Sequence, residues 1–190
     1  MNEARTLTAR GAARRTALLD AAIAVVAAGG SGSLTHRTVA ATAKASLASV
    51  TYHFSSIEDL RRSMFERALQ IVDDQLTATA ATGAPDELPK LAADYVVTLI
   101  THHRSAAAAV QEMIVAATHD PALRPTFHAY HERLAELLSP CVGGRTAGFA
   151  VAATLQGLIV TALTYPDLDT GCFHASVVDE IDRLSVDLPA

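Results

Sequence analysis

The sequence predicts an all-α protein, and its composition and patterning carry this prediction. Half of the 190 residues are hydrophobic but only 5% are aromatic, and the frequent alanines favour closely packed helices. Apolar side chains recur at three- and four-residue spacings, the period of an amphipathic helix. No sustained alternation of β-branched residues indicates a strand. A chain of this length forms one or two small domains with a real core.

The first predicted helix has one apolar face and closes at Gly29 and Gly30. This face consists of Leu18, Leu19, Ala22, Ile23 and Val26. Residues 1–9 are polar with little periodicity, and we expect a mobile arm there. Four arginines in or near this arm could contact phosphate or a minor groove, or could be solvated charges at a helix start. They are Arg5, Arg10, Arg14 and Arg15.

Residues 35–60 predict two short helices joined by a tight turn. Thr35 is a good N-cap for the first helix, because its hydroxyl can accept a backbone N–H of the first turn. Ser46 is the corresponding N-cap of the second helix, which we expect from residue 47 to about residue 53. The first helix ends at Lys44 and Ala45, after a short apolar face of Val39, Ala40 and Ala43.

The outward side of the second short helix is small and polar, which suits a helix that enters the DNA major groove. Val50 and Phe54 lie one turn apart and can pack inward, which leaves Thr51, Tyr52 and His53 facing outward. Small side chains allow close approach to base edges, and a helix N-terminus favours phosphate. A helical hairpin inside a larger bundle would show the same two-helix pattern, so that alternative stays open here.

Together with its flanks, this segment resembles the TetR family of bacterial transcriptional regulators over about residues 10–70. The resemblance lies in Arg14-Arg15-x-x-Leu18-Leu19-Asp20-Ala21-Ala22, in Thr35-x-Arg37-x-Val39-Ala40 with Ala43 and Ser46, and in Val50-Thr51-Tyr52-His53-Phe54 followed by Ser56-x-Glu58-x-Leu60. Three positions depart from the family pattern. Lys44 stands at a usual turn glycine, where a left-handed residue with a Cβ is mildly strained. Ala48 replaces a common glycine, and Ile57 replaces a phosphate-contacting lysine whose charge Lys44 could supply.

The resemblance implies an N-terminal three-helix helix-turn-helix head and a C-terminal helical bundle that dimerises. It also implies DNA-binding candidates in the first short helix, the turn and the second short helix. These are Thr35, Arg37, Lys44, Ser46, Leu47, Ala48, Ser49, Thr51, Tyr52 and His53. The second short helix offers no Arg–guanine or Asn–adenine pair, and its Tyr52 and His53 are better candidates for phosphate contacts.

Charge is distributed unevenly along the chain, whose formal net charge is −5. Residues 1–70 contain nine basic and five acidic residues, a net charge of +4. The remaining residues contain six basic and 15 acidic residues, a net charge of −9. A basic head is what phosphate binding requires, and an acidic body disfavours binding in the wrong orientation.

A long helix is predicted to connect the head to the rest of the chain. Ser56 caps it, and we expect it to run to about residue 79 and to stop before Gly83 and Pro85. Its apolar stripe consists of Leu60, Met64, Phe65, Ala68, Leu69, Val72 and Leu76. The expected boundaries are 1–55 for the arm and DNA-binding domain, 56–84 for the connecting helix, and 85–190 for an effector-binding and dimerisation domain. Because the connecting helix joins the head to the rest of the chain, we expect it to transmit a signal between these two parts.

The remaining residues predict several more helices. Asp86 and Glu87 start one that ends at residues 102–104, and a short helix follows to about residue 118. Pro121 opens the next helix, which ends at Ser139 and Pro140 before the loop at Gly143. The last helix is expected at about residues 172–186.

Residues 146–166 carry no charge, a pattern that also occurs in transmembrane helices. We favour a buried helix, because Gln156 and four threonines interrupt the segment and an acidic segment follows it. A helix that is apolar nearly all round must be covered on both sides, and a second copy of the chain can supply one cover. The predicted dimer interface consists of Phe149, Ala152, Leu155, Ile159, Leu163, Val177, Val178, Ile181 and Leu184.

The family resemblance further implies a pocket for a small-molecule effector in the body. Its candidate lining residues are polar or aromatic residues within otherwise aliphatic helices, which suits a mostly apolar site with a few polar groups. They are Tyr95, His102, His103, Gln111, Glu112, Met113, His119, Phe127, Tyr130, His131, Gln156 and Tyr165. The alternative for each is an ordinary surface or core position.

No cofactor, metal site or catalytic motif is predicted. His128 and His131 share a helical face beside Glu132, but they match no metal-binding pattern. No Ser-His-Asp arrangement, phosphate loop or dinucleotide fingerprint occurs. Cys141 and Cys172 are interpreted as free thiols in a reducing cytoplasm, because no secretory signal precedes them. A redox pair is the less favoured interpretation.

The sequence therefore predicts a cytoplasmic, homodimeric transcriptional regulator, most simply a repressor. Its expected partners are a pseudo-palindromic double-stranded DNA operator, a second copy of itself and a small-molecule effector, with no membrane and no enzymatic activity. One alternative is a regulator without a small ligand. Another is a helical enzyme or metal-binding protein whose first helices only resemble a DNA reader.

Overall fold

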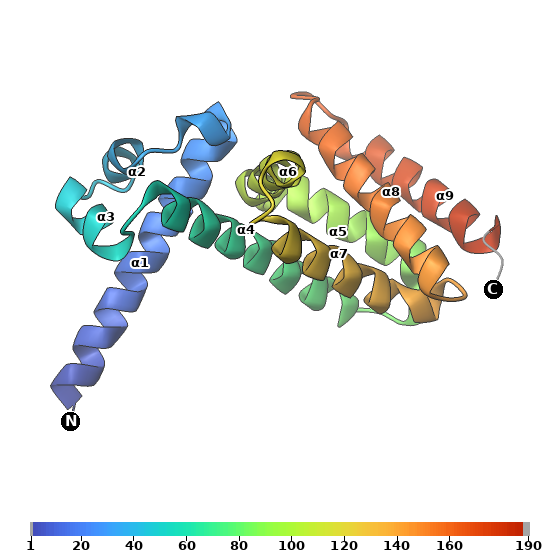
Figure 1. Ribbon diagram of the computed structural model, residues 1–190. Coiled ribbons are helices and arrows are strands. Elements are labelled where there is room, and N and C mark those ends of the chain that lie inside the picture. The colour runs from blue at the N-terminus through green and yellow to red at the C-terminus, as the bar shows by residue number, and fades with distance from the viewer. Residues whose placement is uncertain (1, 188–190) are drawn as a thin grey trace.

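The computed structural model describes residues 2–187, and within this range it contains nine α-helices, three short 3₁₀ segments and no strand. The all-α prediction is confirmed. Helices α1 to α3 lie at one end of the molecule, and α5 to α9 form a bundle at the other end, with α4 running between them (Figure 1). We call these two parts the head and the body.

The head consists of α1 (Asn2–Gly29), α2 (His36–Thr42) and α3 (Leu47–His53), with a short 3₁₀ segment η1 (Ser31–Ser33) after α1. The buried face of α1 is the predicted one. Residues 2–9, expected to form a mobile arm, continue α1 instead, and this part of the helix extends away from the rest of the molecule (Figure 1). Alanine, leucine and arginine are strong helix formers, and they are frequent in this part of the chain.

Three hydroxyl side chains start the helices that follow α1, as predicted. Thr35 Oγ1 accepts a hydrogen bond from the N–H of Thr38 at 3.0 Å. Ser46 Oγ accepts one from Ser49 N–H at 3.1 Å. Ser56 begins α4 (Ile57–Ala80) in the same way. Each cap satisfies a backbone donor that has no partner inside its helix.

The turn between α2 and α3 is closed by a left-handed residue, Lys44, at φ 48°. The N–H of Ala45 donates to the carbonyl of Ala40 at 2.8 Å, and the N–H of Lys44 donates to Ala41 at 3.2 Å. These two bonds form the Schellman motif that commonly ends a helix at a glycine. Lys44 therefore adopts the strained conformation expected where a turn glycine is replaced.

Helix α4 belongs to both parts of the molecule. Leu60 and Met64, near its start, are fully buried in the head core. Leu76 and Thr79, near its end, are buried in the body. An ion pair between Asp73 of α4 and Arg133 of the body, at 2.6 Å, adds a second attachment. Head and body therefore share one continuous helix.

The body consists of five helices and two 3₁₀ segments. They are α5 (Leu88–His102), α6 (Arg104–His119), α7 (Arg124–Leu138), α8 (Arg145–Leu163), α9 (Thr170–Asp187), η2 (Pro85–Glu87) and η3 (Ser139–Cys141). Helix α7 starts at Arg124 rather than at Pro121. Asp120 Oδ1 accepts from the N–H of Ala122 at 3.0 Å, which holds Pro121 in a turn. Pro125 occupies the first helical turn instead.

Helix α8 is long and apolar enough to span a membrane, with a mean hydropathy of 1.6. Its buried side chains nevertheless belong to the core of the body, and 39% of the apolar window is buried. Gly148 lets α8 approach α7 closely, since a Cβ there would collide with the carbonyl oxygen of Ala135. One side of α8 therefore packs in the core of the body, and the other side is exposed.

Candidate functional sites

The outer face of α3 is a small, solvent-exposed surface. Leu47, Ala48, Thr51 and Tyr52 are exposed, and 85% of Tyr52 is accessible to solvent. Ser49 and His53 are half-buried, and Thr35, Arg37, Lys44 and Ser46 are exposed nearby. The opposite side of α3 carries the buried Val50, followed by the buried Phe54. The ten predicted DNA-binding residues thus lie on α3, at the start of α2 or in the turn between these two helices, and eight of them are exposed.

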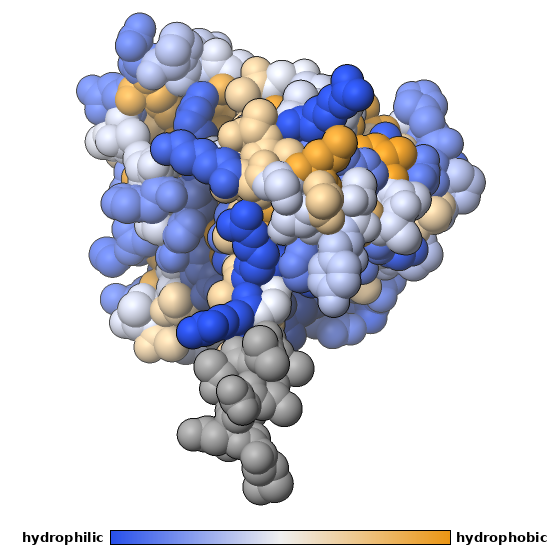
Figure 2. Space-filling view, turned by 90° about the vertical axis from the view of Figure 1, so that its left-hand side faces the viewer, coloured by the Kyte–Doolittle hydropathy of each residue, from blue (hydrophilic) through white to orange (hydrophobic). Residues whose placement is uncertain are grey.

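One basic side chain reaches α3 directly, and two others nearby in the sequence are exposed. Arg14 Nε lies 3.5 Å from Ser49 Oγ, at the start of α3. Arg37 and Lys44 are exposed, and neither forms an ion pair among residues 9–185, whose side chains the structure describes. The end of the molecule formed by the head is largely hydrophilic, with small apolar patches between the polar side chains (Figure 2). A surface of this kind can bind phosphates.

Two residues hold α3 in place, and both roles were missed in the sequence. Arg15 donates to Ser63 Oγ at 2.8 Å, and its guanidinium lies 5.0 Å from the centre of the Phe54 ring. His36 Nε2 lies 3.1 Å from the carbonyl oxygen of Phe54. Arg15 therefore contacts Ser63 and Phe54 of the head while it remains exposed to solvent. Neither contact has a local sequence signal, because the partners are far apart in the chain.

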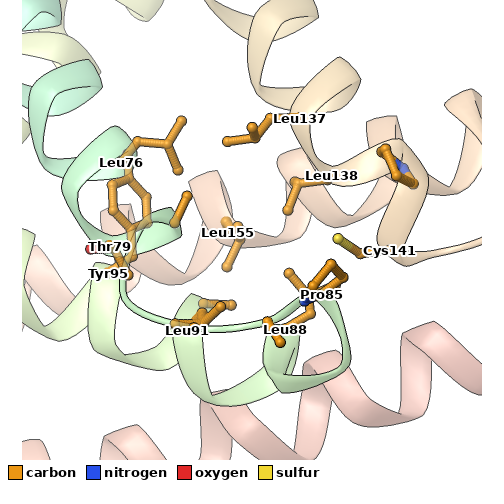
Figure 3. Close-up of a pocket in the computed structure, with 15 residues that line it drawn as sticks. Leu76, Thr79, Pro85, Leu88, Leu91, Tyr95, Leu137, Leu138, Cys141 and Leu155 are labelled. Carbon is orange, nitrogen blue, oxygen red and sulfur yellow. The ribbon is translucent and has the colours of Figure 1, made fainter.

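The body contains an apolar cavity of about 250 Å³ between α4, α5, α7 and α8 (Figure 3). Leucines supply much of its wall, and the loop before α5 closes one side. The lining residues are Leu76, Thr79, Ala80, Gly83, Ala84, Pro85, Leu88, Leu91, Ala92, Tyr95, Leu137, Leu138, Pro140, Cys141 and Leu155. Burial raises the pKa of the Cys141 thiol, which favours its protonated form at neutral pH.

Of the residues predicted to line a pocket, Tyr95 alone lines this cavity. Tyr130, Gln111 and Gln156 surround a much smaller space of about 10 Å³, one turn further along the bundle. His102 and His103 border an open groove between α1, α4 and the α5–α6 turn. The other predicted residues lie elsewhere: Glu112, Met113, His119, Phe127, His131 and Tyr165. The prediction favoured polar residues, whereas leucines and alanines form most of the wall.

The two tyrosines near the cavity are joined through their hydroxyls. Tyr95 Oη and Tyr130 Oη lie 3.4 Å apart, and both side chains are buried. Burial is the main reason why the pKa of each phenol is raised, so both remain neutral hydrogen-bond donors.

Most of the predicted dimer-interface residues lie inside the chain's own core. Ala152, Leu155, Ile159, Val177 and Ile181 are buried, and Leu163, Val178 and Leu184 are half-buried. Phe149 is exposed on a different stripe of α8, which we call the α8 outer stripe. It consists of Phe149, Ala153, Gly157, Val160, Thr161 and Thr164. A helix that is apolar all round gives no sign in the sequence of which side faces its own core.

No group of three or more histidine, cysteine or acidic side chains that could hold a metal ion occurs among the described residues. Cys141 and Cys172 are both free, the first half-buried and the second exposed.

The sequence matches two family models. Residues 18–64 match the family described as bacterial regulatory proteins of the tetR family, and residues 83–186 match the tetracyclin repressor-like C-terminal domain. No curated protein matches the chain.

Solved structures share the fold along nearly the whole chain. A TetR-family member of Streptomyces coelicolor, SCO1917, is 30% identical with a TM-score of 0.77, and the match covers 93% of this chain and 99% of that one. The multidrug binding protein EbrR, solved with imidazole, is 30% identical with a TM-score of 0.72, covering 93% and 97%. EbrR has also been solved with malachite green. A transcriptional regulator of Rhodococcus, 20% identical with a TM-score of 0.80, covers 93% and 99% and supports the fold alone.

Proposed function

Since this chain belongs to the TetR family of transcriptional regulators, we propose that it is a homodimeric repressor that leaves its operator when a small molecule binds in the body. The observation that carries the proposal is the combination of an exposed, cation-flanked α3 with an apolar cavity that α4 helps to line. The first feature suits DNA, and the second suits an effector.

The proposed DNA contacts divide into two kinds. Leu47, Ala48 and Thr51 would approach base edges in the major groove, because they are exposed on the first turns of α3. Tyr52 and the cations beside α3 would contact phosphates and set the orientation of the head. Both kinds draw on the ten residues predicted from the sequence, with Arg14 added because it reaches Ser49.

A dimer is proposed because one short helix reads only a few base pairs. Two copies of α3 at a spacing of about 34–36 Å would read successive major grooves of a pseudo-palindromic operator. The α8 outer stripe supports this proposal, since it exposes Phe149 and Val160 beside the small Ala153 and Gly157. Small residues allow two helices to approach closely, and the apolar ones would be covered.

The effector would act through α4. Leu76 and Thr79 of this helix line the cavity, while Leu60 and Met64 of the same helix pack in the head. A ligand that binds more tightly to one position of α4 would shift the spacing of the two heads. The relative EbrR is named as a multidrug binding protein, which supports a small-molecule role for the corresponding part of this chain.

The alternatives are less well supported. A regulator without a small ligand would need no cavity in its body, whereas the body of this one contains a partly open cavity of about 250 Å³. An enzyme would need a catalytic constellation, and the family consists of transcriptional regulators. Because it acts on DNA, we place the protein in the bacterial cytoplasm, with no catalytic function.

The test is selection of bound sequences from a random DNA pool by the full-length protein, followed by a salt titration of the selected site. A pseudo-palindrome whose affinity falls steeply with salt is expected. The Arg37→Ala/Tyr52→Ala variant should lose this binding, whereas Thr77→Ala, on the exposed side of α4, should retain it. Failure of the folded dimer to enrich any sequence would contradict the proposed function.

A further inference from the structure

The wall of the body cavity carries no charged side chain. Glu87, in the adjoining η2 segment, is directed to the backbone instead, where it accepts from the N–H of Ala84 at 3.0 Å. The cavity is open to solvent on one side, where Leu137 and Pro140 are exposed. A cation that moved from this side to the buried part of the wall would lose hydration water without gaining a counter-ion, and an anion would gain no cationic partner. The lining therefore selects against ions of either sign.

Two hydroxyl-bearing residues line the wall, Thr79 and Tyr95. Thr79 Oγ1 accepts a hydrogen bond from Gln75 Nε2 at 3.0 Å, whereas the Tyr95 hydroxyl is paired with that of Tyr130, a residue outside the lining. Tyr95 lines the cavity, whereas Tyr130 lines the much smaller space beyond it. Because their hydroxyl oxygens are 3.4 Å apart, the pair lies where the cavity ends. Tyr95 is 1% exposed and Tyr130 is 6% exposed, so solvent does not reach the pair freely.

The two phenols together carry two O–H hydrogens, but the hydrogen bond between them uses only one. Each phenol carries one O–H, and only one of the two hydrogens can lie between the oxygens. Neither hydroxyl makes another hydrogen bond among residues 9–185, whose side chains the structure describes. One buried donor is therefore available to an acceptor, and buried donors are usually satisfied.

We infer that the cavity binds an uncharged, mostly apolar molecule about the size of two fused rings, which accepts a hydrogen bond from the Tyr95–Tyr130 pair. A cavity of about 150 Å³ is filled by one benzene ring, and the volume here is about 250 Å³. The inference rests on the proposed function only in taking this cavity as the effector site.

Three probes of nearly equal shape test the inference: naphthalene, quinoline and the cation N-methylquinolinium. Naphthalene has no acceptor, and quinoline carries one acceptor nitrogen and is uncharged at neutral pH. Binding of each to the full-length protein is measured by calorimetry. Quinoline should bind at least tenfold more tightly than N-methylquinolinium. Equal or tighter binding of the cation, or no binding of any of the three, would overturn the inference.

The Tyr95→Phe/Tyr130→Phe variant tests the hydrogen bond. Replacing both partners by apolar side chains of the same shape is close to neutral for folding. Quinoline affinity should fall roughly fivefold in this variant, as expected for one net hydrogen bond, while naphthalene affinity stays unchanged. An unchanged quinoline affinity would exclude the pair as the donor.

A change of charge tests the selection against cations. Leu91→Glu places a carboxylate in the wall at a half-buried position, so N-methylquinolinium should gain affinity there. Val115→Glu, at an exposed residue of α6 outside the cavity, is the matched control and should change nothing. Equal affinity of the two variants for N-methylquinolinium would contradict the inference. Binding to DNA is measured separately. Absence of DNA binding would contradict the proposed function, whereas failure of the probe experiments would contradict the inferred class of ligand.

Discussion

Glu112 of α6 and Ser31, at the junction after α1, are joined by a hydrogen bond across the boundary between body and head. The N–H of Ser31 donates to Glu112 Oε2 at 2.9 Å. Gly30, at φ 75°, lies against the same carboxylate, and a Cβ at Gly30 would come within 3.7 Å of it. The sequence suggested Glu112 as a pocket residue, but the structure uses it to attach the head.

Glu112→Ala should weaken the attachment of the head. A hydrogen bond to a charged acceptor stabilises by about 1.5–3 kcal/mol, and partial exposure of this one favours the lower figure. The free energy of unfolding should fall accordingly, and the amide hydrogen of Ser31 should exchange faster by NMR. Glu136→Ala, which removes an exposed acid near Arg145, is the control and should leave both quantities unchanged. Unaltered exchange at Ser31 in Glu112→Ala would contradict this role.

Lys44→Gly should stabilise the head and weaken DNA binding. Glycine relieves the strain at φ 48°, which costs about 1–2 kcal/mol for a residue with a Cβ, although greater freedom of the unfolded chain offsets part of this gain. Loss of a phosphate contact would make the slope of the logarithm of the DNA-binding constant against the logarithm of salt concentration less steep by about one unit. Lys44→Ala is the matched variant: it removes the charge but keeps the strain. Equal stability of the two variants would argue against strain at this turn.

Gly157→Arg should produce a folded monomer. A Cβ at Gly157 meets nothing within 4 Å in the single chain, and arginine favours a helix over glycine by roughly 1 kcal/mol. The added charge would lie in the middle of the α8 outer stripe and prevent its burial against a second copy. Sedimentation velocity measures the mass, and circular dichroism measures helix content. Thr77→Arg, on the exposed side of α4, should remain dimeric. A dimeric Gly157→Arg would show that copies associate elsewhere.

His131 should make stability depend on pH. Burial, and secondarily the nearby His128, lowers the pKa of His131, whose ring lies 4.5 Å from that of Phe149. The unfolded chain then binds more protons than the folded chain between the lowered pKa and the ordinary value near about 6.5. The contribution of His131 to the free energy of unfolding is complete above the ordinary pKa, and it is lost as the pH falls from the ordinary pKa to the lowered one. Urea unfolding of the protein and of His131→Gln, between about pH 5 and 7, measures it. A variant with the same pH dependence as the unchanged protein would contradict this assignment.

Much of the head could be predicted from the sequence because its signals are local. Thr35, Ser46 and Ser56 each cap a backbone group three residues away, and Val50 and Phe54 are one turn apart. The strain at Lys44 also follows from one position in one turn. Such features depend on neighbours in the chain, so the sequence by itself determined helix α3, the caps of the helices around it and the exposed residues of α3.

The functional features of the body depend on tertiary structure. Its cavity is the space that side chains from α4, α5, α7 and α8 leave unfilled, and leucines that line a cavity look the same in sequence as leucines that fill a core. The outward side of α8 and the role of Glu112 likewise depend on partners far away in the chain. Periodicity identifies an apolar helix, but only the packing of several helices decides which of its sides is covered and where space remains.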